Sequence, residues 1–264
     1  MSERQYVKSD TLFDACLHPA GLNDQDLQTL ALFGVKGAVA VSWTLSATAK
    51  SIRAHFDDLL EKQLPRLRRA GIRGYAALGV HPAGLPRRGL SEVLASLPGY
   101  CRAGQVVAIG ALGLREGNSS EEQALLEQLD VAKTLKLRAL VAVPREGHES
   151  ALKKTLWALK KSGLPERRAA LLGVDGKGLT AVRERGHHAT LLLHPDYLSV
   201  EAAVGLLKKQ GSERVMLGSA CGRTASDFLA LARAQSVMEK QKVSAHFAAH
   251  VLADNAAAFF KVHV

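Results

Sequence analysis

Long hydrophobic runs are missing from this chain, and cysteines are few. No apolar stretch reaches the roughly 18 residues that a membrane span needs, so we expect no membrane segment. The first ten residues lack the apolar block of a secretory signal. The 3 cysteines, Cys16, Cys101 and Cys221, are scattered and odd in number. They do not form a disulfide framework, and we predict a cytoplasmic protein.

Aromatic residues are also scarce, whereas positive charge is abundant. The aromatic content of 5% provides no platform on which single-stranded bases could stack. The 35 Lys and Arg exceed the 25 Asp and Glu and give a net charge of +10, a surface that attracts nucleic acid or another polyanion. These residues are dispersed in pairs such as Arg87/Arg88 and Lys160/Lys161, which is typical of solvated helix faces. Nucleic-acid binding through the basic surface is therefore an alternative and not the first hypothesis.

The chain does contain enough apolar sequence for a large core. Hydrophobic residues make up 47% of its 264 residues, and the sequence shows no linker or low-complexity segment. An α/β barrel of this length commonly forms one undivided domain. We therefore expect residues 1–264 to form a single domain.

Short runs of valine, alanine and leucine recur along the chain, with amphipathic segments between them. The runs are continuously apolar, as expected for parallel strands that are covered on both faces. Eight such runs favour an α/β fold of the (β/α)8 TIM-barrel type, and no glycine-rich phosphate motif follows the first run to suggest a dinucleotide-binding sheet. The expected strands are 11–15, 37–41, 73–80, 106–112, 139–143, 170–174, 189–193 and 214–218.

Helices are expected between these strands wherever apolar residues recur at helical spacing. The glycine-rich segment 175–178 lacks the spacing of a P-loop, and we interpret it as a turn rather than a phosphate-binding loop. The expected helices are 24–33, 48–69, 120–135, 149–162, 200–210, 225–240 and 244–260.

The end of the first expected strand carries two possible metal ligands, Cys16 and His18. Residues two apart on a strand point to the same face, so both side chains can reach one cation. The alternative is a small buried thiol beside a hydrogen-bonded barrel histidine, since both residue types are common in cores.

Several strand-end motifs also stand in an order that is known from one family. They are Phe13-Asp14-x-x-x-His18, Gly79-Val80-His81-Pro82, Val107-Ala108-Ile109-Gly110-x-x-Gly113-Leu114, His194-Pro195 and Asp254-Asn255-Ala256-x-x-Phe259. Over nearly the whole chain this order resembles the TatD-related branch of the amidohydrolase superfamily. The resemblance implies a TIM barrel that holds two metal ions and hydrolyses its substrate, in several members DNA.

The resemblance also implies a ligand set, and this chain departs from it. His18 keeps the second of two strand-one histidines, Cys16 replaces the first, and Ala111 stands in place of the bridging glutamate. Alanine, valine and glycine side chains cannot coordinate a metal. The remaining expected ligands, on strands five, six and eight, fall on Ala142 or Val143, on Val174 or Asp175, and on Ala220 or Gly222.

We therefore predict a TatD-like barrel that has lost two-metal hydrolysis and acts as a pseudoenzyme, as a binding protein or through metal-free chemistry in the old cleft. The alternative is a hydrolase of esters or phosphodiesters, or a nuclease, with one metal ion such as zinc held by Cys16, His18 and Asp175, because thiolate is a good zinc ligand. His194 is a further candidate ligand. Catalytic residues are not assigned.

Four further residues follow strands three, five, seven and eight, at the face where TIM barrels carry their sites. His81 and His194 each precede a proline, and Arg145 and Arg223 can clamp an anion. Histidines in ordinary turns and solvated arginines are the alternative interpretation. These four residues lead us to expect a small-molecule or anionic ligand in the barrel mouth.

Overall fold

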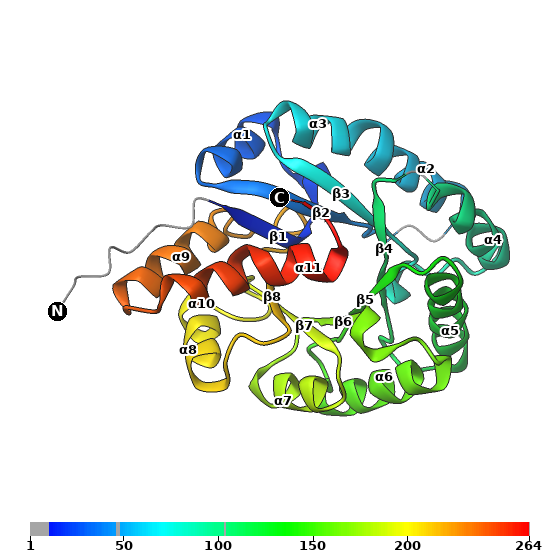
Figure 1. Cartoon of the computed structure of the whole chain (residues 1–264). Helices are drawn as coiled ribbons and strands as arrows, with labels where there is room; N and C mark the ends of the chain where they lie inside the picture. Colours follow the sequence, from blue (N-terminus) through cyan, green and yellow to red (C-terminus); the bar gives the residue numbers. More distant parts are fainter. Residues whose placement is uncertain (1–10, 46–47, 103, 264) are drawn as a thin grey trace.

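Eight parallel strands in sequential order form one sheet that curls into a barrel. The computed structural model describes residues 11–45, 48–102 and 104–263. Figure 1 shows the ring of strands with helices outside it, which confirms the predicted (β/α)8 TIM barrel. The strands are β1 Leu12–Leu17, β2 Val35–Val41, β3 Arg73–Leu78, β4 Val106–Gly113, β5 Arg138–Ala142, β6 Ala169–Leu172, β7 His188–Leu192 and β8 Val215–Gly218.

Backbone hydrogen bonds just beyond β8 bring the first and last strands together. The amide of Ala220 donates to the carbonyl of Cys16 at 2.8 Å, and the amide of His18 donates to the carbonyl of Cys221 at 2.9 Å. Gly21 and Gly222 pass so closely that a Cβ atom on Gly21 would collide with the carbonyl of Gly222. The end of β1 therefore lies beside the segment that follows β8.

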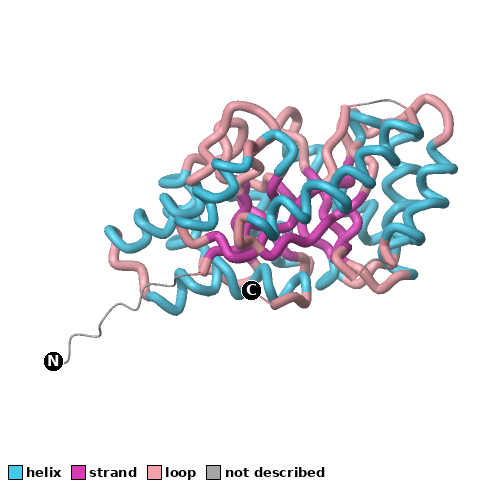
Figure 2. The backbone as a smooth tube through the Cα atoms, turned by 90° about the horizontal axis from the view of Figure 1, so that it is seen from above, coloured by secondary structure: helices cyan, strands magenta, loops and turns pink. Residues whose placement is uncertain are grey.

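The helices cover the outer face of the barrel, and Figure 2 shows the strands enclosed by them. No helix among the described residues is long and apolar enough to cross a membrane. The π-helical turns Leu59–Gln63 and His250–Asp254 join α2 to α3 and α10 to α11, so the expected helices 48–69 and 244–260 run on without a break. The helices are α1 Asp24–Leu32, α2 Ala49–Asp58, α3 Leu64–Arg69, α4 Leu90–Tyr100, α5 Ser119–Thr134, α6 His148–Ser162, α7 Gly176–Glu184, α8 Val200–Gln210, α9 Ala230–Lys240, α10 Ala245–Ala249 and α11 Asn255–Phe260.

Two helices, α4 and α7, were not predicted from the sequence. Pro98 and Gly99 lie inside α4, and glycine opens α7 at its first and third positions, so the helical signal is weak in both. The predicted turn at 175–178 is wrong, because Asp175 is the N-cap of α7. Its Oδ1 accepts a hydrogen bond from the amide of Gly178 at 2.6 Å.

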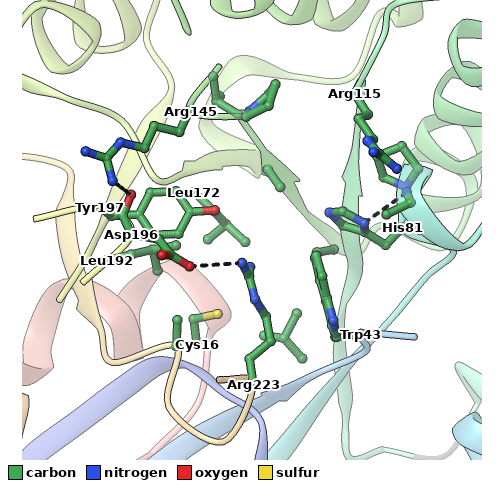
Figure 3. Close-up of a pocket in the computed structure, with 18 of the residues that line it drawn as sticks. Cys16, Trp43, His81, Arg115, Arg145, Leu172, Leu192, Asp196, Tyr197 and Arg223 are labelled. Atoms are coloured by element: carbon green, nitrogen blue, oxygen red, sulfur yellow. Dashed lines mark hydrogen bonds and ion pairs between the residues drawn. The ribbon is translucent and has the colours of Figure 1, made fainter. Parts of the chain in front are cut away.

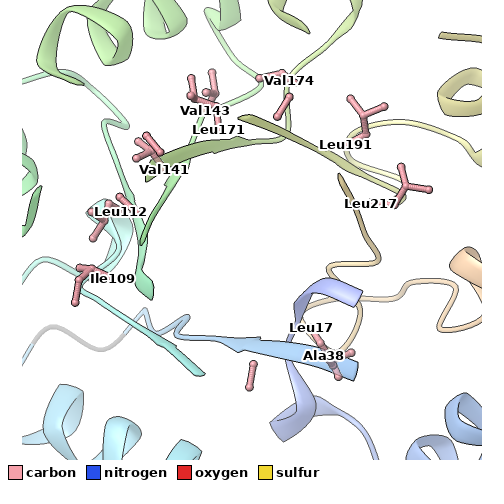
Figure 4. Close-up of a cluster of buried hydrophobic side chains, with 14 of the residues drawn as sticks. Leu17, Ala38, Ile109, Leu112, Val141, Val143, Leu171, Val174, Leu191 and Leu217 are labelled. Atoms are coloured by element: carbon pink, nitrogen blue, oxygen red, sulfur yellow. The ribbon is translucent and has the colours of Figure 1, made fainter. Parts of the chain in front are cut away.

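Apolar side chains fill both faces of the sheet. On the outer face they point away from the barrel axis toward the helices, as Figure 4 shows for Leu112, Val141 and Leu191. On the inner face Phe13 stacks between Tyr75 and Phe260, with ring centroids 6.3 and 6.1 Å away. Phe260 belongs to α11, which packs against β1 and β8 and crosses in front of the barrel in Figure 1. The C-terminal helix thus closes the end of the barrel opposite the carboxyl ends of the strands.

The Phe13 ring should be a large contributor to stability, because it is fully buried at the centre of this packing. Phe13→Ala leaves a cavity between Tyr75 and Phe260 and should lower the free energy of unfolding by about 3–5 kcal/mol. Leu32→Ala, at a leucine that is 82% exposed, should change it by less than about 0.5 kcal/mol. Urea unfolding of the two variants tests this, and equal losses would contradict the described packing.

Candidate functional site

A cavity of about 410 Å³ opens at the carboxyl ends of the strands, where Figure 3 looks into it. The deepest part of its wall comes from the strand ends themselves. Four of the side chains are the last residues of β2, β5, β6 and β7, one lies in β4 and one lies two residues after β8. We call this set the floor: Val41, Ala142, Leu172, Leu192, Ala111 and Ala220.

Longer side chains from the loops surround the opening, and we call them the rim. They follow β2, β3, β4, β5, β7 and β8, so most of the barrel contributes to it. Positive charge exceeds negative charge in this set. The rim consists of Trp43, His81, Arg115, Arg145, Glu146, Asp196, Tyr197 and Arg223.

Arg223 is the most firmly held charge of the rim. Its guanidinium lies over the indole ring of Trp43, 4.2 Å from the ring centroid, and its Nη2 lies 3.6 Å from Oδ2 of Asp196. The side chain is only 19% exposed. The His81 ring also contacts Trp43, at a centroid distance of 4.0 Å. The arginine is therefore fixed in one place, with part of its hydrogen-bonding edge free to meet a ligand.

The two buried histidines of the mouth have defined tautomers. His18 Nδ1 lies 3.0 Å from the carbonyl of Val41 and must donate to it, so Nε2 keeps its lone pair. His81 Nδ1 accepts from the amide of Ala83 at 3.2 Å, so its Nε2 carries the hydrogen. Burial, with a further contribution from Arg223, lowers the pKa of His18 to about 4 and that of His81 to about 3. Both rings are neutral at neutral pH.

Cys16 lies beside His18, with its Sγ 3.9 Å from Nε2. Burial raises the pKa of this thiol, and the neighbouring Asp14 raises it further. A thiol in this state is a poor nucleophile, because the thiolate is the reactive form. The pair can still offer one sulfur and one nitrogen to a bound group.

Asp14 serves the barrel rather than the cavity. Its two oxygens accept from the hydroxyl of Ser219 at 2.5 Å and from the amides of Ser219 and Cys16, each at 3.0 Å. Burial raises the pKa of Asp14 to about 6. The carboxyl group thus ties β1 to the segment after β8.

The structure brings five of the seven candidate residues to one cavity: Cys16, His18, His81, Arg145 and Arg223. Two others do not line it. His194 accepts from the amide of Asp196 and contacts the Thr224 hydroxyl at 3.0 Å, so it supports the loops from behind. Asp175 caps α7, with its Oδ1 3.6 Å from His148 Nε2, and is not brought to Cys16 and His18. Asp175 was a candidate because the family resemblance placed a strand-six ligand at this position. A resemblance of this kind does not reveal that the side chain caps a helix.

Sequence reasoning missed three rim residues and two residues that position the loops. Trp43, Arg115 and Tyr197 line the cavity. Of these three, only Trp43 lies close enough to the end of an expected strand for the sequence to suggest it as a site residue. On α5, Glu121 accepts from three loop amides, including that of Arg115 at 2.9 Å. Gln128 holds the backbone of Val80 before His81, accepting from its amide at 2.7 Å. The sequence shows that a helix carries a carboxylate or an amide, but it does not show which loop that side chain holds.

The residues present do not fit a pair of metal ions. A two-metal centre needs several carboxylates or imidazoles, one of them bridging both ions. Near the strand ends the mouth offers the sulfur of Cys16 and one imidazole nitrogen of His18, and the floor side chains are all apolar. The two carboxylates that line the cavity, Glu146 and Asp196, belong to the rim. Among the residues that the structure describes, no group of three or more His, Cys, Asp and Glu is placed to hold a metal ion.

Comparisons with known proteins agree with the architecture. The chain is 25% identical over 256 residues to an uncharacterized metal-dependent hydrolase of Methanocaldococcus jannaschii, covering 95% of this chain and 100% of that one. A TatD-like protein from Archaeoglobus fulgidus is similar with a TM-score of 0.77 and 27% identity, over 95% of this chain and 100% of the other. A TatD homologue from Escherichia coli K12 gives 0.72 and 20%, over 96% and 98% of the two chains. No protein-family model matches the chain.

An eight-stranded parallel barrel with a cavity at its strand ends is the architecture of TIM-barrel proteins. Over nearly its full length the chain is similar to TatD-like metal-dependent hydrolases of archaea. The resemblance found in the strand-end motifs is confirmed for family and fold.

The neutral state of His81 has a consequence for stability at low pH. Because its pKa in the folded protein lies below the unfolded value of about 6.5, the unfolded chain binds the proton more readily. This histidine therefore lowers the free energy of unfolding as the pH falls from about 6.5 toward 4. The variant His81→Asn keeps an acceptor for the Ala83 amide. Between about pH 6.5 and 4.5 its free energy of unfolding should fall by roughly 2 kcal/mol less than that of the native protein.

Urea unfolding at the two pH values measures this difference. His246→Asn, at an exposed histidine on α10, is the matched control and should follow the native protein. Asp14 acts in the opposite sense, since its raised pKa adds stability as the pH falls below about 6. The native protein and both variants contain Asp14, so its effect cancels in the comparison. An unchanged pH dependence in His81→Asn would contradict the assignment of a neutral imidazole.

Proposed function

We propose that this TatD-like barrel has lost two-metal hydrolysis and binds a small anionic molecule in its mouth, as a binding protein or with metal-free chemistry. The observation that carries the proposal is the apolar floor. At the strand ends, where the relatives' common architecture would place metal ligands, side chains such as Ala111, Leu172 and Ala220 line the cavity. A shared fold does not transfer an activity whose ligating side chains are missing.

The rim supports the second half of the proposal. Arg115, Arg145 and Arg223 outnumber the acidic side chains of Glu146 and Asp196, and the buried histidines add no charge. Guanidinium groups recognise carboxylate and phosphate through paired hydrogen bonds. A cavity of about 410 Å³ has the size of a small-molecule site.

The loss of two-metal chemistry has a direct test. Protein purified without chelator should contain far less than one equivalent of Zn, Mn or Ni by elemental analysis, because the mouth cannot ligate a pair of ions. With these metals added, it should not cleave single-stranded DNA or a chromogenic phosphodiester. Metal-dependent turnover that disappears in His18→Ala, and persists in the remote control His246→Ala, would overturn the proposal.

A mononuclear metal hydrolase is the second candidate, favoured by one contact. His18 Nε2 keeps its lone pair and faces the sulfur of Cys16 at 3.9 Å, so the two atoms can share one cation. The named activity of the relative from Methanocaldococcus jannaschii, a metal-dependent hydrolase, agrees with this candidate. With Asp175 capping α7, water or the ligand itself must complete the coordination.

Zinc titration by calorimetry distinguishes the two candidates. We expect no saturable zinc binding at micromolar concentration in the native protein, and no difference between it and Cys16→Ser. Binding of one equivalent that is lost in Cys16→Ser but kept in Cys101→Ser would establish the mononuclear site instead.

Binding of nucleic acid through the basic surface is the remaining candidate, and it rests on the net charge of +10. It requires an affinity for DNA or RNA that falls steeply as salt is raised. We expect only weak association that vanishes near physiological salt, since the paired basic residues are spread around the helices. Tight binding that survives at this ionic strength would favour the polyanion function.

A further inference from the structure

The floor and the rim differ sharply in polarity, and this difference constrains the ligand. Leu172 and Leu192 are 3% and 4% exposed, and Ala111 and Ala220 are 3% and 2% exposed. They nonetheless line the cavity, so what little surface they expose faces its interior. Displacement of water from this apolar wall by an apolar group lowers the free energy of the system.

A charged group cannot take the same place without a large cost. The floor offers no side-chain donor, and the histidine that borders it, His18, donates its one N–H to the carbonyl of Val41. Burying a carboxylate or phosphate there would remove its hydration without replacing the hydrogen bonds. The charged end of an anionic ligand must therefore stay at the level of the rim.

The rim is built to receive such a charged end. Its three arginines exceed its two carboxylates by one positive charge, with His81 neutral. The Asp196 carboxylate is already engaged by Arg223, and Arg145 donates to the Asp196 carbonyl at 2.8 Å (Figure 3). His81 keeps an N–H at Nε2 as a further donor.

We propose that the ligand is an amphipathic organic anion, which places a compact apolar group on the floor and a carboxylate or phosphate head against Arg223 and Arg115 at the rim. The proposal rests on the proposed function, since a metal pair would require donors where the apolar group lies. The class covers aryl and short branched alkyl groups, because the cavity of about 410 Å³ is small among ligand sites and its floor is compact.

Arg223 is the anchor that gives the head its position. Trp43 and Asp196 hold its guanidinium before a ligand arrives, so little conformational entropy is lost on binding. Trp43 is itself held through its backbone amide, which donates to His55 Nε2 at 3.2 Å. The aromatic rings of Trp43 and Tyr197 then border the apolar group from the side.

A panel of five probes tests the orientation by calorimetry, with a chelator present. Inorganic phosphate and acetate carry only a head, phenyl phosphate and phenylacetate carry a head and a ring, and benzyl alcohol carries only a ring. Each ring-bearing anion should bind about tenfold to a hundredfold more tightly than its head alone, as burial of one ring predicts. The two head groups distinguish a phosphate ligand from a carboxylate ligand.

Two variants separate the contributions of floor and rim. Ala142→Leu fills the floor and should weaken the ring-bearing anions about tenfold or more, while inorganic phosphate and acetate bind as before. Arg223→Met keeps the contact with Trp43 but removes the charge, and should weaken all four anions about tenfold. Ala232→Leu on α9, outside the mouth, is the control and should change none of them. Thermal unfolding verifies that each variant is folded.

Equal affinities for phosphate and phenyl phosphate, unchanged in Ala142→Leu, would overturn the amphipathic orientation and leave anion binding in the mouth intact. Failure of all four anions to bind would overturn the orientation and, with it, the anion-binding part of the proposed function. The loss of two-metal chemistry is judged separately, by metal content and phosphodiester cleavage, so that part of the proposed function and the orientation of the ligand can fail independently.

Discussion

In a closed parallel barrel all strands end at the same face, and the residues at those ends decide what the protein can bind. Here that constraint brings the last residues of β2, β5, β6 and β7 to one cavity, and all four are apolar. The core of the barrel thus continues up to the floor of its mouth. Phe13 and the C-terminal helix α11 fill the opposite end, so the mouth is where the inner core meets solvent.

Burial in this mouth also determines where charge remains. His18 and His81 are held neutral because a buried imidazolium would be poorly solvated, and the thiol of Cys16 stays protonated for the same reason. The arginines of the rim lie at the level of the loops. The result is a site that is apolar inside and cationic outside, whereas a two-metal hydrolase needs anionic and imidazole ligands inside. Similarity to TatD-like relatives supports the barrel fold, whereas the chemistry of the site depends on these side chains.

Sequence patterns predicted the barrel because its strands are apolar on both faces and carry their signal locally. The strand predicted at 106–112 is β4, and the helix predicted at 200–210 coincides with α8. Where glycine or proline interrupts the helical period the prediction failed, as in α4 and α7. The presence of a thiol at Cys16 and of a methyl group at Ala111 was also readable from the sequence, since donor atoms are a property of the residue itself.

The sequence by itself determined that the chain forms a TatD-like barrel and which residue types stand at its strand ends. Only the tertiary structure decided which remaining side chains share the mouth. Arg223 and His81 lie 142 positions apart in the chain and both contact Trp43, whereas Asp175 turns away to cap α7. Strands and helices follow from local periodicity, but the direction of a loop side chain depends on partners that are distant in sequence, such as Asp196 for Arg223.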